Sequence, residues 1–234
     1  MITHALIRPL CRPLAVSLAV PIPGGFRPST LPGIWAWYDA LDASTLYDAT
    51  SGGSLVALGS PVARVNDKSG NGRHLTQTDP TKRPLRSALG VASDNVNDRL
   101  EIARTRTGAY TLCVRMKLTN IGGYSRFFGI NYTYSGVFAD NTLAMVNEDV
   151  AWGSSAVTPT LNSMATVTLV RSSATYVELR VNGSAIATLN GGQAGDADAF
   201  LALMKGEYSR VVLTESVLSG TQLTALETWV AATI

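Results

Sequence analysis

Apolar and polar residues alternate along much of the chain beyond residue 33, which is the period of a β-strand with one buried face. The pattern is clearest in YTLCVRMKL at 110–118, where Tyr, Leu, Val, Met and Leu share one face and Thr, Cys, Arg and Lys share the other. These alternating runs predict a series of short antiparallel strands. Further strands are predicted at 164–171, 176–181, 184–189, 200–204 and 208–214.

Two local signals define how the predicted strands and the last element are connected. Asn182-Gly183 separates two strand runs and predicts a tight hairpin, because a type I′ turn needs positive φ at both central residues. Ser219 followed by Gln222 is a capping box, and apolar residues then recur at helical spacing. Many short strands followed by one helix predict an all-β antiparallel sandwich with a C-terminal helix.

The first 32 residues have a different character. Their prolines oppose both a continuous helix and a central strand, so we expect an extended N-terminal arm at 1–32 and the sandwich at 33–234. A signal peptide is the alternative for the apolar run at 14–20, although prolines interrupt or bound it and no small-x-small cleavage site follows. The arm is expected to anchor the protein through Arg8, Leu10, Arg12, Leu14 and Phe26.

Composition excludes several classes of protein. Hydrophobic residues make up 46% and charged residues 15%, which fits a folded β-rich chain. The net charge of +2 is too small to indicate nucleic-acid binding, and no apolar stretch reaches the length of about 18 residues that membrane insertion requires. The two cysteines, Cys11 and Cys113, lie far apart and indicate no disulfide scaffold.

Several longer motifs resemble those of the laminin-G-like, or concanavalin A-like, jelly-roll domains, particularly domains of bacteriophage virion proteins. The likeness extends from about residue 31 to the end of the chain, and it implies a jelly-roll sandwich but does not define an activity. The motifs are IWAWYDALDASTL at 34–46, VARVNDKSGNGRHLTQTDPTKRP at 62–84, DNVNDRLEI at 94–102, VELRVNGSAIATL at 177–189 and YSRVVLTESVLSGTQLTALETWVA at 208–231.

No catalytic constellation is evident in the sequence. A glycosidase needs two carboxyl groups placed across a sugar, and the nearest acidic pairs, Glu148-Asp149 and Asp196/Asp198, lie in loop-like contexts. Only two histidines are present and no nucleophile-elbow motif occurs, so Ser-His-Asp chemistry and a zinc site are both disfavoured. We therefore expect no catalytic residues, no bound cofactor and a protein that is not an enzyme.

Calcium is the one metal that the pattern leaves open. Laminin-G-like domains often hold one calcium ion at a loop rim, and the hard oxygen ligands that calcium prefers are clustered here in one short segment. Local Asx turns explain the same residues without a metal, because Asn and Asp side chains bond to the nearby backbone. The candidate ligands are Asp94, Asn95, Asn97 and Asp98.

Aromatic residues offer a candidate binding surface. Tyr132, Tyr134 and Trp152 are expected either to contact a glycan or partner near a hairpin tip, or to pack in a core or between subunits. Trp35 and Trp37 are expected on one face of an entry strand, with Trp229 on the last helix, as core residues that join the two ends of the chain.

The segment NDKSGNGRH at 66–74 has the richest chemistry per residue. A phosphate-binding loop would need a lysine after the second glycine and a following helix, but Lys68 precedes both glycines and HLTQ continues as a strand. A turn is therefore predicted, with Gly70 and Gly72 at positive φ and Asp67 capping it through its side chain. A metal held by Asp67 is the alternative.

Taken together, the resemblance implies a structural protein on the surface of a phage particle. We expect a tail-fibre or tail-tip protein that binds a host receptor, docked to other virion proteins through its arm, homo-oligomeric and by analogy trimeric, with a host cell-surface glycan as its ligand. A capsid decoration or head-fibre protein is one alternative. A secreted carbohydrate-binding module or a glycan-degrading enzyme is the alternative from another class.

Overall fold

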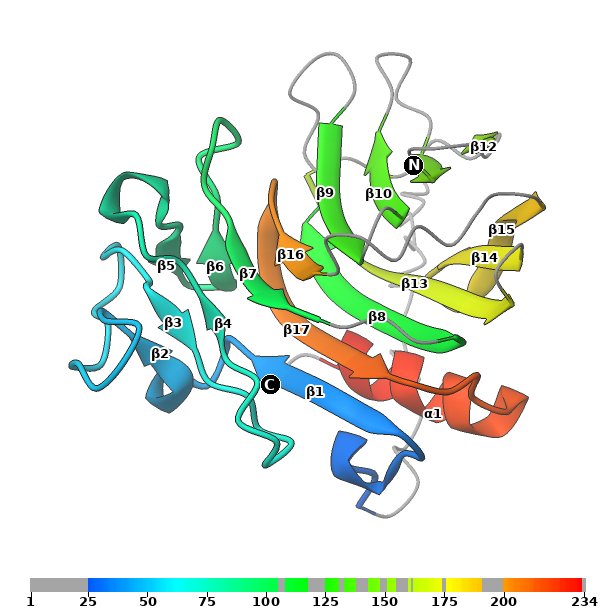
Figure 1. Ribbon diagram of the computed structural model, residues 1–234, viewed down its shortest axis with the longest axis horizontal. Helices are drawn as coiled ribbons and strands as arrows, with labels where there is room; N and C mark the ends of the chain where they lie inside the picture. The colour runs from blue at the N-terminus through cyan, green and yellow to red at the C-terminus, as the bar shows by residue number, and fades with distance from the viewer. Residues whose placement is uncertain are drawn as a thin grey trace, which may run out of the picture.

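The computed structural model describes residues 25–104, 108–117, 125–130, 133–137, 143–147, 151–154, 160, 162–173, 176–190 and 200–232 (Figure 1). Within these ranges the strands pair in antiparallel fashion throughout, and the chain ends in helix α1 (Gly220–Ala231). The predicted all-β sandwich with a C-terminal helix is confirmed.

The first sheet contains eight of the described strands, in the order β15-β14-β13-β8-β17-β6-β5, with β1 also pairing with β17. Its central strands β8 and β17 come from the middle and the end of the chain, so the sheet ties distant segments together. The strands are β1 (Ile34–Asp39), β5 (Leu85–Ser87), β6 (Gly90–Ala92), β8 (Tyr110–Lys117), β13 (Met164–Ser173), β14 (Tyr176–Val181), β15 (Ser184–Asn190) and β17 (Glu207–Thr214).

The second sheet contains nine of the described strands, in the order β12-β11-β10-β9-β16-β7-β4-β3-β2. They are β2 (Leu46–Tyr47), β3 (Arg64–Val65), β4 (Leu75–Thr76), β7 (Leu100–Ala103), β9 (Ser125–Ile130), β10 (Thr133–Val137), β11 (Leu143–Asn147), β12 (Ala151–Ser154) and β16 (Phe200–Leu203). Three short 3₁₀ helices lie in the connections: η1 (Pro28–Thr30), η2 (Ala43–Thr45) and η3 (Pro80–Lys82).

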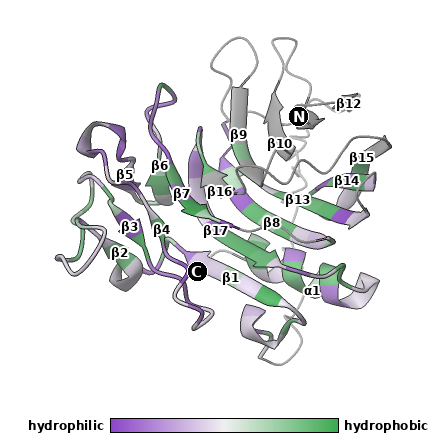
Figure 2. Ribbon diagram, in the orientation of Figure 1, coloured by the Kyte–Doolittle hydropathy of each residue, from purple (hydrophilic) through white to green (hydrophobic). Residues whose placement is uncertain are grey.

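The main core lies between the two sheets. The apolar face predicted for 110–118 is confirmed in β8, where Leu112, Val114 and Met116 are fully buried in the same cluster as Leu75 and Phe128 of the second sheet. Figure 2 shows hydrophobic residues along β8, β13 and β17 in the middle of the molecule. Each such side chain contributes about 1.5–3 kcal/mol when removed from water, so alternation alone specifies which face packs inward.

A second, smaller core covers the opposite face of the first sheet. Leu226 and Val230 of α1 pack against Cys113 and Val212, which lie on the faces of β8 and β17 turned away from the main core. The predicted capping box is confirmed at the helix start, where the Ser219 side chain accepts from the backbone N–H of Gln222. No helix in the described ranges is long and apolar enough to span a membrane.

A buried arginine fastens the end of α1 to the sheet. Arg210 of β17 donates from Nη1 to the backbone carbonyls of Trp229 (2.8 Å) and Ala232 (2.7 Å), and its Nε lies 3.5 Å from Asp39 of β1. Its guanidinium also lies 4.6 Å from the centroid of the Trp229 ring. The last carbonyls of a helix lack intrahelical partners, so this side chain serves as the C-terminal cap.

Strand β1 departs from simple alternation. The register moves from Ile34–Thr214 to Ala36–Leu213, which leaves Trp35 as the extra residue of a β-bulge. As a result Trp35 is buried in the main core while Trp37 lies in the helix-side cluster, so the prediction that they share a face is wrong. The predicted link between chain ends is made by Trp37, whose ring meets that of Trp229 edge-on at 5.5 Å.

The Asn182-Gly183 connection between β14 and β15 is the predicted two-residue hairpin. Both residues have positive φ, 48° and 84°, as a type I′ turn requires. The Asn182 side chain also accepts a hydrogen bond from the backbone N–H of Thr166, which ties the turn to β13.

Candidate functional site

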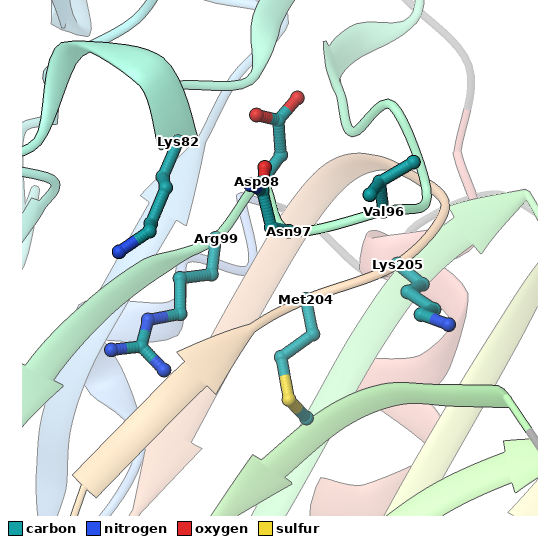
Figure 3. Close-up of a pocket in the computed structure, with 7 residues that line it drawn as sticks. All are labelled: Lys82, Val96, Asn97, Asp98, Arg99, Met204 and Lys205. Atoms are coloured by element: carbon teal, nitrogen blue, oxygen red, sulfur yellow. The ribbon is translucent and has the colours of Figure 1, made fainter.

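A pocket of about 540 Å³ opens at one end of the sandwich, between the segment 96–99 and the link from β16 to β17 (Figure 3). The volume falls within the range of about 300–1,000 Å³ that is typical of small-molecule sites. Two apolar residues and several polar residues face it, from three separate parts of the chain. They are Lys82, Val96, Asn97, Asp98, Arg99, Met204 and Lys205.

The loop above the pocket is held by its own side chains. Oδ1 of Asp94 accepts from the backbone N–H groups of Val96 (2.8 Å), Asn97 (3.2 Å) and Asp98 (3.3 Å). Burial opposes ionisation of Asp94, but these three hydrogen bonds outweigh it and lower the pKa of its carboxyl group. The loop is therefore closed into a compact Asx turn before any ligand binds.

The same loop is fixed to the other wall of the pocket. Asn95 adopts a positive φ of 64°, and its Oδ1 accepts from the backbone N–H of Gly206 at 2.9 Å. The backbone of Ser93 also donates to the carbonyl of Gly206 at 2.9 Å. Because both walls are joined, the pocket is a preformed feature of the described chain.

These hydrogen bonds bear on calcium. Oδ1 of Asp94, Oδ1 of Asn95 and Oδ2 of Asp98 each already accept from a backbone N–H group, which competes with metal ligation. In the part of the chain that the structure describes, no group of three or more His, Cys, Asp or Glu side chains is arranged to hold a metal ion. Calcium binding at this loop stays a prediction.

The charged groups around the pocket differ in how they are engaged. Nζ of Lys82 lies 3.1 Å from Asp79, and Nε of Arg99 lies 3.3 Å from Glu101; all four side chains are about half-exposed. Lys205 has no ion-pair partner among the described residues. Burial raises the pKa of the Asp98 carboxyl, with the nearby Asp94 charge acting in the same direction. The pocket can therefore offer several donors to a polar ligand.

The 66–74 turn, the most polar motif of the sequence, has a structural role. Oδ1 of Asp67 accepts from the backbone N–H groups of Trp37 (3.1 Å) and Ser69 (2.8 Å), and Oδ2 accepts from Ser69 Oγ (2.7 Å) and the backbone N–H of Arg73 (3.1 Å). A carboxylate has about four acceptor positions, so none is left for a metal ion. The predicted positive φ is confirmed at Gly70 (89°) and Gly72 (68°).

This turn also occupies the side of β1 that does not face β17. The backbone N–H of Lys68 donates to the Trp37 carbonyl at 2.8 Å, and the Asn71 side chain donates to the Trp35 carbonyl at 2.9 Å. An exposed strand edge is a template for unwanted pairing, and this turn covers it (Figure 1, the loop that follows β3). His74 accepts from the backbone N–H of Asp67 through Nδ1 at 3.1 Å, which fits a positioning role within the turn.

The predicted aromatic surface is only partly described. Tyr132 lies outside the described residues, while Tyr134 is in β10 and Trp152 is in β12. The strand register places Tyr134 opposite Val146 of β11, and Val146 opposite Trp152, so the three residues form one row across the sheet. A glycan or partner surface at these residues stays a prediction.

The predicted anchoring residues fall in two places. Arg8, Leu10, Arg12 and Leu14 lie outside the described residues, as do the acidic pairs at 148–149 and at 196 and 198. Phe26 is described, and its ring lies 6.5 Å from that of Trp229 on α1. Leu31 is buried in the same helix-side cluster, so the described residues just before β1 pack on the sandwich.

Lys82, Arg99, Met204 and Lys205 were not predicted as site residues. Lys82 and Arg99 were recognised only as parts of fold motifs, and no sequence spacing links either of them to residues 204–205. The fold joins them through a backbone hydrogen bond from Arg99 N to the Lys82 carbonyl at 3.1 Å and through the Asn95–Gly206 bond.

Comparison with known proteins gives matches of structure rather than of sequence. No protein-family model matches the chain, and no curated protein matches it significantly. A Trypanosoma rangeli sialidase in complex with sialic acid superposes with a TM-score of 0.62 at 11% identity, over 84% of this chain and 33% of the sialidase. Another structure of the Trypanosoma rangeli sialidase gives 0.60 at 13% identity, over 84% and 32%. Domain 4 of a Geobacillus stearothermophilus GH43 arabinanase, in complex with arabinotriose, gives 0.49 at 15% identity, over 83% and 98%.

The matches to the Trypanosoma rangeli sialidase define the class of the fold. At such low identity they show a β-sandwich consistent with the concanavalin A-like fold, and the chain spans about a third of the sialidases that it matches. The prediction that the protein is not an enzyme, made from the lack of a catalytic motif, is overturned, because an enzyme, the Trypanosoma rangeli sialidase, contains a sandwich of this fold. Enzymatic activity is therefore left open by the fold.

Proposed function

We propose that this sandwich is a carbohydrate-binding domain and that its ligand occupies the pocket between residues 96–99 and 204–205. The observation that carries the proposal is the preformed pocket itself, whose walls are joined by the Asn95–Gly206 hydrogen bond. A site that is ordered before binding does not lose the conformational freedom of its loops when the ligand arrives.

The lining suits a sugar better than an apolar ligand. Met204 and the exposed Val96 offer apolar contact for the C–H faces of a sugar ring, and Asn97 and Arg99 offer hydrogen-bonding groups for its oxygens. The structural likeness to the Trypanosoma rangeli sialidase, which has been seen in complex with sialic acid, supports this choice. This context favours carbohydrate over other polar ligands.

The more specific role inferred from the sequence, attachment of a phage particle to its host, is compatible with a glycan-binding domain. In that setting weak binding at each pocket would be multiplied by the number of copies on the particle. None of the matches reported above is a phage protein, so the virion location, the docking arm and the trimer remain predictions.

A glycan array probed with the full chain tests the proposed function, followed by calorimetry with the best ligand. Asn97→Ala removes a lining side chain but keeps the backbone N–H that bonds to Asp94. It is expected to weaken binding by about tenfold, equivalent to about 1.4 kcal/mol. Arg27→Gln changes an exposed residue that does not line the pocket and serves as the control.

Two results would count against the proposal: no saccharide bound by the wild-type chain, or full affinity retained by Asn97→Ala. Analysis of the incubated glycans for cleavage products, made in the same experiment, measures whether the protein also has hydrolytic activity.

A further inference from the structure

We infer that the pocket selects an acidic saccharide, and that Lys82, Arg99 and Lys205 recognise the carboxylate of its sugar. This inference rests on the proposed function, since it specifies which carbohydrates the same pocket binds. It follows from the number of cations around the pocket, from the way each of them is engaged, and from the apolar residues between them.

The three cations come from three separate segments of the chain. Lys82 ends η3, Arg99 lies just before β7, and Lys205 lies in the link between β16 and β17. Figure 3 shows Lys82 and Arg99 on one side of Met204 and Lys205 on the other. An anion in the pocket would therefore have positive charge on two sides.

Two of these cations have partners that an anionic ligand can displace or share. The Lys82–Asp79 and Arg99–Glu101 pairs lie in solvent, with side chains 38–50% exposed, and exposed pairs of this kind are weak. Glu101 contacts Nε of Arg99, and within the described chain no other partner engages the terminal guanidinium nitrogens. Those nitrogens remain suited to a planar carboxylate, which arginine binds through paired N–H donors.

The one acid that lines the pocket does not oppose an anion strongly. Oδ2 of Asp98 accepts from the backbone N–H of Asp94 at 2.9 Å, and Asp98 is only 8% exposed. Figure 3 shows its carboxyl group extending to the opposite side of the loop from the Arg99 guanidinium. Burial also raises the pKa of its carboxyl group, which works against its negative charge.

The neighbours of the cations favour a sugar acid over a free inorganic anion. Met204 lies between the cations and Val96 is 78% exposed at the mouth, so a ligand with only charged oxygens would leave both without a partner. A pyranose ring that carries a carboxylate can contact both the apolar residues and the cations, because its C–H face is apolar and its acid group is planar. The volume of about 540 Å³ also exceeds what a single small anion needs.

The test uses pairs of saccharides of which one member carries carboxylates and the other carries none: trimers of galacturonate and galactose, of glucuronate and glucose, of mannuronate and mannose, and sialyllactose with lactose. Calorimetry with the full chain is expected to show that the acidic member of at least one pair binds about tenfold or more tightly than its neutral counterpart. Arg99→Gln and Lys205→Gln are each expected to remove most of that preference, measured in each variant as the ratio of the acidic to the neutral affinity. Arg27→Gln should keep the preference.

The outcomes separate this inference from the function on which it rests. If neutral members bind as tightly as acidic ones, the acidic preference is refuted and the carbohydrate-binding function stands. If no member of any pair binds, the acidic preference and the carbohydrate-binding function are both refuted. If inorganic phosphate alone competes with the acidic saccharide at equal affinity, the site recognises a bare anion and the inference is also refuted. Unchanged melting temperatures of the two Gln variants confirm that they are folded.

Discussion

The carboxylate of Asp67 should contribute far more to stability than its place in a polar surface turn suggests. Asp67→Ala removes the acceptor for two backbone N–H groups beyond Ser69, that of Trp37 in β1 and that of Arg73 at the far end of the turn. A hydrogen bond to a charged group contributes about 1.5 kcal/mol or more, so the loss of these two bonds should lower the free energy of unfolding by about 3 kcal/mol. The local bonds to Ser69 add to this loss.

Asp79 provides a matched control within the same chain. Its carboxylate accepts from the backbone N–H and the hydroxyl of Thr81, just as that of Asp67 accepts from both groups of Ser69. These hydrogen bonds and the pair with Lys82 lower the pKa of Asp79 to about 2. Asp79 is nevertheless exposed and bonds no distant backbone, so water replaces its partners in Asp79→Ala.

Urea unfolding followed by tryptophan fluorescence measures the difference in unfolding free energy between the two variants. Trp35 and Trp37 lie beside the 66–74 turn and report on it directly. Asp67→Ala is expected to lose much more stability than Asp79→Ala, with an unchanged slope of free energy against urea. Equal losses in the two variants would refute the idea that Asp67 acts through β1. If added calcium raises the melting temperature of the wild-type protein but not that of Asp67→Ala, the carboxylate holds a metal ion instead.

Three further predictions concern buried groups. Arg210→Met should cost about 3 kcal/mol by leaving the Asp39 carboxylate unpaired, and Asp39→Asn in the same chain should restore part of it; additive losses in a double-mutant cycle would argue against the pair. Burial raises the pKa of Cys113 to about 12, so at pH about 8 its thiolate fraction is on the order of 10⁻⁴. In a Cys11→Ser chain, thiol labelling should therefore require urea, and rapid labelling of the native protein would contradict this burial. Because folding raises the pKa of Asp98, its stabilising effect is present at low pH and is lost as pH rises through that pKa. Asp98→Asn should thus gain stability relative to wild type as the pH rises through the pKa of Asp98, and a pH-independent difference would contradict the shift.

Periodicity and turn chemistry predicted the central part of the fold well. Strand β8 follows the alternation of 110–118, the Asn182-Gly183 turn has the expected positive φ at both residues, and Ser219 caps α1 as its spacing with Gln222 indicates. These features depend on residues that are neighbours in sequence, so the sequence alone can report them.

Features that depend on distant contacts could not be predicted in this way. The bulge at Trp35 is defined by the register with β17, so alternation placed Trp35 and Trp37 wrongly on one face. Strands β3 and β4 have two residues each, which is too short for any period to show. The pocket joins Lys82 to Lys205 across more than a hundred residues, and neither residue carries a motif that reveals its role.

The position of β1 in the sheet has a consequence for the nascent chain on the ribosome. Ile34 pairs with Thr214, so about 180 more residues must be synthesised before β1 meets its strand partner. At about 5–20 residues per second this delay is ~9–36 s. The partner residues in the 66–74 turn emerge within a small fraction of that time and can bond to β1 at Trp35 and Trp37. During translation the turn can therefore shield one edge of an apolar strand from other nascent chains until the last strand arrives.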